Sequence, residues 1–257
     1  MSNKITTNGL QKLNLLMGFL HFGQAILILV LSKVFTLPIS GNYLVFNSGT
    51  QSLLPTTKVL FNLSLPILIA IFFFLSAAAH FIIATTYRKK YNDDLARGIN
   101  KARWIEYAVS ASIMMVAISL LVGVYDAMSL VMIFVLTSVM NLMGLVMEIH
   151  NQTTKKTSWL SYIIGCVAGV IPWLVIVFYF WMSYANAIGD AKTPTFVYWI
   201  FVSIFIFFNC FAINMVLQYK KVGSWKNYLY GERAYIILSL VAKSLLAWQV
   251  FAGTLRP

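Results

Sequence analysis

Lys243 is the residue of this chain that most clearly indicates a chemical role, because it lies in the middle of an apolar stretch that runs from Tyr235 to Phe251. A lysine at the centre of a membrane-length helix costs roughly 2.5 kcal/mol or more on insertion scales. Lysines near helix ends avoid this cost because the amine can reach the membrane surface. Lys243 is far from either end, so its amine must be neutral, paired with an acid, or covalently modified.

Glu106 is the acid best placed to meet this amine. The other six acids fall in expected loops or close to expected helix ends: Asp93, Asp94, Asp126, Glu148, Asp190 and Glu232. Helical side chains lean toward the N-terminus of their own helix, so the stem of Lys243 should reach toward the depth of Glu106. Ser239, four residues before Lys243, and Ser110, four residues after Glu106, could complete a hydrogen-bonded polar site.

Two histidines form a second candidate cluster in the same half of the expected helices. His21 is followed by Gln24, and His80 comes one turn after Ser76. A buried histidine can simply be a satisfied core residue, and that interpretation stays open for both. Because imidazole titrates near neutral pH, the pair could also accept and hold a proton, with Ser76 and Gln24 as polar neighbours.

The elements that must position these groups are membrane-spanning helices. Hydrophobic residues make up 60% of the 257-residue chain and charged residues 10%, against about 25% charged in a soluble domain. Lipid offers backbone groups no hydrogen-bond partners, so helices are the expected spanning element. Seven apolar runs reach the required length of about 20 residues, near 11–31, 59–86, 102–124, 127–149, 159–183, 195–219 and 232–254.

The pattern therefore predicts an all-α fold, in which residues 1–257 form one seven-helix domain of a multi-pass protein in the cell membrane. The one long connection, 32–58, is rich in Gly, Asn, Ser, Thr and Pro and has apolar residues at Tyr43, Val45 and Phe46. A short β-hairpin is a possible structure for this connection.

The distribution of Lys and Arg predicts the orientation. Fourteen cations lie on the face that carries the N-terminus: Lys4, Lys12, Arg88, Lys89, Lys90, Arg97, Lys101, Arg103, Lys155, Lys156, Lys220, Lys221, Lys226 and Arg233. Four lie on the other face: Lys33, Lys58, Lys192 and Arg256. The positive-inside rule then places the N-terminus in the cytoplasm and the C-terminus outside. The same asymmetry accounts for most of the net charge of +12 without a nucleic-acid partner.

Several segments resemble heliorhodopsins over nearly the whole chain. The long segment from Gly231 to Thr254, which contains Lys243, is similar to their seventh helix, and Arg103-Trp-Ile-Glu-Tyr107 is similar to their third. The segment from Gly165 to Trp173 resembles the fifth helix, and Ser224-Trp-Lys-Asn-Tyr228 the last cytoplasmic connection.

The resemblance implies a photoreceptor and not an enzyme, with an inward N-terminus as the cations also predict. It implies that Lys243 binds all-trans retinal as a Schiff base, that Glu106 is the counterion, and that His21 and His80 belong to a proton-accepting cluster. A homodimer in the lipid bilayer and a cytoplasmic signalling partner are further expectations from the family. Apolar or aromatic residues are needed around a polyene, and the candidates are Tyr107, Met115, Trp173, Phe207, Phe208 and Trp248.

Two other functions remain as alternatives. Lys243 and Glu106 could form an intramembrane ion pair in a light-gated proton channel or an ion transporter, since intramembrane ionisable residues often mark such paths. A zinc hydrolase would need three or four ligands that converge on one point. His21 and His80 are expected inside the membrane and His150 at its surface, so this pattern does not favour a metal site.

Overall fold

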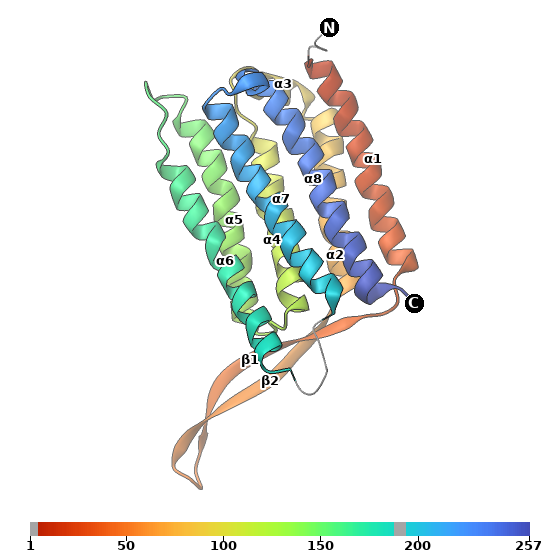
Figure 1. Cartoon of the computed structure of the whole chain (residues 1–257), viewed down its shortest axis with the longest axis vertical. Coiled ribbons are helices and arrows are strands. Elements are labelled where there is room, and N and C mark those ends of the chain that lie inside the picture. The colour runs from red at the N-terminus through yellow and green to blue at the C-terminus, as the bar shows by residue number, and fades with distance from the viewer. Residues whose placement is uncertain (1–4, 188–193) are drawn as a thin grey trace.

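The computed structural model describes residues 5–187 and 194–257, and it confirms the expected bundle of seven long helices (Figure 1). These helices are α1 (Thr7–Leu31), α2 (Leu65–Ala84), α4 (Lys101–Leu121), α5 (Ala127–His150), α6 (Leu160–Ala185), α7 (Thr195–Tyr219) and α8 (Tyr228–Val250). All seven are long and apolar enough to cross a membrane, which makes the chain a multi-pass integral membrane protein. Lys4, Asp190 and Lys192 lie outside the described residues.

Side chains just before several helices fix where these helices begin. Thr6 accepts a hydrogen bond from the backbone N–H of Gly9, and Asn100 accepts one from Arg103. Asp126 does the same for Ser129 at the start of α5. Such caps satisfy backbone N–H groups that have no partner within the helix. They set the register of the polar side chains that follow on each helix.

The connection between α1 and α2 is a two-stranded antiparallel hairpin, β1 (Thr36–Asn47) and β2 (Ser52–Ser64), which confirms the expected hairpin. The helix predicted to begin at 59 is wrong over its first six residues, which belong to β2. Thr36 pairs with Ser64 at the base of the hairpin. The helix α2 then starts at Leu65, where Pro66 is tolerated in the first turn because the N–H it lacks would be unpaired there.

The hairpin projects from the end of the bundle that carries the C-terminus (Figure 1). Its base is attached to the start of α5. The backbone N–H of Ser40 donates to the carbonyl of Tyr125 at 2.9 Å, and Asn42 Nδ2 donates to Asp126 Oδ1 at 3.1 Å. The long connection is thus an ordered element that is fastened to the helical bundle.

Three short elements were not predicted. The helix α3 (Arg88–Ala96) lies at the end of the bundle where the chain begins, which we call the N-terminal end (Figure 1). A 3₁₀ turn, η1 (Gly223–Lys226), precedes α8, and a π-helical turn, η2 (Phe251–Leu255), follows it. Two residues of α3, Tyr91 and Leu95, are buried against apolar residues of α1, α2 and α8.

The helices pack around a shared core. Neighbouring pairs are α1 with α2, α2 with α4, α4 with α5, α5 with α6, α7 with α8, and α8 with α1. The largest apolar cluster contains residues from all seven long helices, including Phe72 and Ile118 with no or almost no exposed surface. The side chain of Trp173 on α6 meets Phe201, Phe205 and Phe208 on α7 edge to face. The packing places the polar side chains described next inside the bundle.

Candidate functional site

The structure brings Lys243 and Glu106 together inside the bundle. Lys243 on α8 is 3% exposed, and its Nζ lies 3.0 Å from Oε1 of Glu106 on α4. Ser239, one turn earlier on α8, has its Oγ 2.9 Å from the same nitrogen. Ser76 on α2 donates to Glu106 Oε1 at 2.6 Å. Four side chains from three helices therefore form one hydrogen-bonded cluster around the ion pair of Lys243 and Glu106.

Tyr107 forms a wall of this site. The Lys243 nitrogen lies 5.2 Å from the centre of the Tyr107 ring, within the range of a cation–π interaction. The Tyr107 hydroxyl donates to the backbone carbonyl of Tyr235 on α8 at 2.9 Å, and this bond holds the ring in place. The cation at position 243 thus has an anion on one side and an aromatic face on another.

A mostly apolar cavity of about 230 Å³ adjoins Lys243. Residues of α4, α5, α6, α7 and α8 line it, and among them are Lys243, Ser239, Tyr107, Trp173 and Phe208. A few polar groups in an apolar pocket are typical of a ligand site, although such sites usually measure about 300 Å³ or more. An elongated apolar aldehyde that reacts with an amine fits this donor set: a lysine in the wall, a carboxylate beside it and aromatic residues around it.

Three of the predicted pocket residues are not among the described residues that line the cavity: Met115, Phe207 and Trp248. Met115 is 1% exposed and belongs to the main apolar core. Phe207 is half-buried on α7, next to the lining residue Phe208. The indole nitrogen of Trp248 donates to Oε1 of Gln24 at 2.9 Å, so Gln24 ties α1 to α8 instead of contacting a histidine.

The two predicted histidines stack on each other. The rings of His21 on α1 and His80 on α2 have centroids 5.4 Å apart and an interplanar angle of 9°. His80 Nδ1 lies 2.7 Å from Oδ1 of Asn14. Within the described ranges, both ring nitrogens of His21 and the hydroxyl of Ser110 are buried without a hydrogen-bond partner. His80 lies one turn of α2 after Ser76, which contacts Glu106.

Asn14 was missed by sequence reasoning although a signal was present. It lies in the apolar run of α1, seven residues before His21, and positions seven apart share a helix face. Its Nδ2 donates to the carbonyl of Leu10 at 2.8 Å, and the side chain is 1% exposed. Asn14 belongs to the histidine cluster in place of the predicted Gln24.

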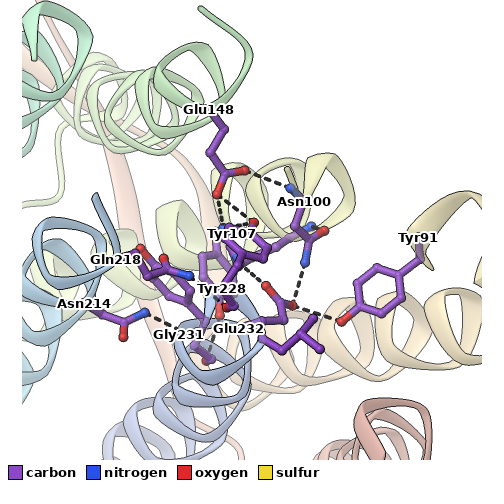
Figure 2. Close-up of polar contacts among 12 residues, drawn as sticks. Tyr91, Asn100, Tyr107, Glu148, Asn214, Gln218, Tyr228, Gly231 and Glu232 are labelled. Carbon is purple, nitrogen blue, oxygen red and sulfur yellow. Dashed lines mark hydrogen bonds and ion pairs between the residues drawn. The ribbon is translucent and has the colours of Figure 1, made fainter. Parts of the chain in front are cut away.

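Sequence reasoning also missed a buried cluster of charged side chains at the N-terminal end of the bundle, which we call the Arg103 network (Figure 2). Arg103 was counted among the fourteen cations of the face that carries the N-terminus, but it is 4% exposed. Its guanidinium pairs with Glu148 on α5 at 2.5 Å and with Glu232 on α8. The predicted placement of both acids near helix ends was correct, but their burial was not expected.

Polar neighbours add hydrogen bonds to both carboxylates of this network (Figure 2). Tyr91 donates to Glu232 Oε1 at 3.1 Å, and Asn100 Nδ2 donates to the same oxygen at 2.6 Å. The backbone N–H of Asn100 and the hydroxyl of Tyr228 donate to Glu148. Burying two carboxylates with one guanidinium is costly unless the remaining lone pairs are satisfied in this way.

Tyr91 lies on α3, outside the spanning helices, and its environment has a clear electrostatic effect. Burial, and after it the charge of Glu232, raises the pKa of Tyr91 well above its usual value. The hydroxyl therefore stays protonated and acts as a donor to Glu232. At the opposite end, hydrogen bonds from Ser129 lower the pKa of Asp126.

Comparison with known families gives one match that covers nearly the whole chain. The family model Heliorhodopsin matches residues 10–255, which includes α1 from Leu10 onward, the other six spanning helices in full, and every side chain of the site described above. A comparison with curated proteins gives no match.

Proposed function

The chain belongs to the heliorhodopsin family, whose members are retinal-binding light-sensing rhodopsins, and from this premise we propose that Lys243 carries retinal as a Schiff base with Glu106 as counterion. Retinal bound there in the all-trans form would supply light absorption and a photoisomerisation. The observation that carries the proposal is the buried pair of Lys243 and Glu106 at the wall of the cavity.

Glu106 serves this role because a positive charge at Nζ of Lys243 is expensive without a nearby anion. Ser76 and Lys243 both donate to its Oε1, which orients the carboxylate toward the cation. Ser239 holds the nitrogen from the side of α8. The aromatic residues Tyr107 and Trp173 of the cavity restrict where an elongated apolar group can lie.

The histidine pair supplies the acceptor for a proton that leaves Nζ of Lys243. His21 and His80 lie on α1 and α2, toward the N-terminal end from Ser76, and this is the end that we propose faces the cytoplasm. A proton that moves to them can return to Nζ along the same path. The photocycle is then an internal proton transfer without net ion pumping.

The output of the cycle is a conformational signal at the cytoplasmic face. The Arg103 network lies at that face and shares α4 and α8 with the pair of Lys243 and Glu106. A homodimer and a cytoplasmic partner that reads the signal belong to this proposal through the family alone.

The experiment is regeneration of the purified protein with all-trans retinal, followed by absorption spectroscopy. A visible band is expected, and Lys243→Ala should abolish it. Lys33→Ala is the matched control, because Lys33 is exposed outside the spanning helices, and this variant should keep the band. A colourless wild type, or a band that survives Lys243→Ala, would contradict the proposal.

The same buried ion pair also supports a second candidate, a light-gated proton channel or an ion transporter that uses Lys243 and Glu106. Proton flux in liposomes separates the two functions. Flux that depends on illumination and on Glu106 favours the channel, and a coloured protein without flux favours the sensor.

A further inference from the structure

The side-chain amide of Asn14 has one orientation that satisfies its neighbours. Its Nδ2 lies 2.8 Å from the carbonyl oxygen of Leu10, and its Oδ1 lies 2.7 Å from Nδ1 of His80. A carbonyl oxygen only accepts hydrogen bonds, so the flipped amide would place two acceptor oxygens against each other. The amide nitrogen therefore faces Leu10, and the amide oxygen faces His80.

A neutral imidazole has one N–H and one bare nitrogen, and the neighbour of each nitrogen decides which is which. Because Asn14 offers His80 an acceptor, Nδ1 must carry the hydrogen. We propose that Asn14 is a positioning residue that holds His80 in the Nδ1–H tautomer, so that Nε2 of His80 is the atom that accepts the proton. This inference rests on the proposed function, in which the histidines receive a proton from Nζ of Lys243.

The assignment gives the two stacked histidines different roles. His21 has no hydrogen-bond partner at either ring nitrogen within the described residues, so no neighbour selects its tautomer. His80 is the oriented member, one turn from Ser76, and Ser76 contacts Glu106. The transfer balances, because the proton leaves Nζ and adds to Nε2. His80 then carries both N–H groups and the positive charge, while Nδ1–H continues to donate to Asn14.

Nitrogen-15 NMR of protein with labelled histidine rings tests the tautomer directly, without illumination and with or without retinal. His80→Gln assigns the signals by their disappearance. A protonated Nδ1 and a bare Nε2 are expected for His80 in the wild type. The reverse pattern, with the hydrogen on Nε2, would overturn the inference, and this measurement needs no variant at position 14.

Asn14→Leu tests whether the amide causes the tautomer. This variant keeps the approximate shape of the side chain but removes the acceptor, so the His80 signals should move to the Nε2–H form or to a mixture. Asn141→Leu is the control for this readout, because Asn141 is also buried and donates to the carbonyl four residues earlier at 2.9 Å. Unchanged His80 signals in Asn14→Leu would remove Asn14 from the role.

A kinetic readout links the tautomer to the proton transfer. In retinal-loaded Asn14→Leu, the light-driven loss of the visible band should slow about tenfold or more, since a misplaced acceptor loses much of the benefit of general base catalysis. An unchanged rate would contradict the inference. A colourless wild type would defeat the proposed function instead, and the NMR result on the same protein would still decide the tautomer.

Discussion

Arg103 and Glu106 lie three residues apart on α4, and each pairs with a residue of α8. Arg103 pairs with Glu232 at the N-terminal end, and Glu106 pairs with Lys243 deeper in the bundle. The same two helices are therefore joined by two buried ion pairs at different depths. A shift of α8 relative to α4 that alters one pair must also strain the other, which gives the site a physical connection to the end of the bundle.

Arg103→Leu should destabilise the protein strongly, because it leaves Glu148 and Glu232 buried without their cation. Removal of one partner of a buried pair costs about 3–5 kcal/mol. The midpoint of thermal unfolding in detergent should fall accordingly. Arg233→Leu is the matched control, since Arg233 is exposed and adjacent to Glu232, and it should leave the midpoint nearly unchanged.

The acids themselves provide the complementary test of the Arg103 network. If unpaired charge is the cause, Arg103→Leu combined with Glu148→Gln and Glu232→Gln should recover most of the lost stability. A triple variant no more stable than Arg103→Leu would mean that the guanidinium acts mainly through its packing on Tyr235, whose ring centre lies 4.0 Å from it.

Glu106→Gln should change the spectrum of the retinal-loaded protein. An amide cannot offset the positive charge at Nζ of Lys243, so the band is expected at longer wavelength. As the pH is raised, the variant should lose the band at a lower pH than the wild type does, because the protonated imine gives up its proton more easily without the anion. The measurement is an absorption spectrum across a pH series. Asp93→Asn, which alters an exposed acid of α3, is the control. A variant that titrates like the wild type would exclude Glu106 as the counterion.

The pair of Lys243 and Glu106 was predictable because helix direction determines where a long side chain reaches. The same reasoning placed Ser239 on the lysine side of the site, and this contact is present. Ser110 was expected to contact Glu106, but its hydroxyl has no hydrogen-bond partner in the described part of the chain. Ser76 makes the contact instead, because α2 packs directly against α4.

Other features depend on packing that no single segment reveals. Residues 59–64 are apolar enough to extend a predicted helix, and only pairing with β1 across the turn makes them a strand. Arg103 looks like one more cation at the surface end of its helix when the sequence is read alone, because its partners come from α5 and α8. The tautomer that we propose for His80 depends on Asn14 of another helix.

Asp126→Ala should lower the free energy of unfolding at neutral pH but not at acidic pH. Asp126 caps α5 through Ser129 and holds Asn42 of the hairpin, and the loss of such a cap costs about 1 kcal/mol. Its pKa is lowered on folding by the bonds from Ser129. The contribution is therefore complete above the unfolded pKa of about 3.9, and it is lost as the pH falls through the lower folded pKa.

The measurement is the difference in thermal midpoint between the wild type and Asp126→Ala as a function of pH. The difference should be constant near neutrality and should vanish at acidic pH. Asp93→Ala serves as the control, because Asp93 is exposed on α3 at the other end of the bundle. A difference that persists after Asp126 is protonated would indicate that the side chain acts by packing and not by its charge.

Two substitutions distinguish the contribution of the Tyr107 ring from that of its hydroxyl. Tyr107→Phe keeps the ring that lies 5.2 Å from the Lys243 nitrogen, but it loses the bond to the carbonyl of Tyr235. A typical hydrogen bond contributes about 1 kcal/mol, so the thermal midpoint should fall slightly while the visible band stays in place. Tyr107→Leu also removes the aromatic face, and because a cation and its anion then lose a polarisable neighbour, the band should shift. If both variants shift the band equally, the hydroxyl and not the ring is what the chromophore senses.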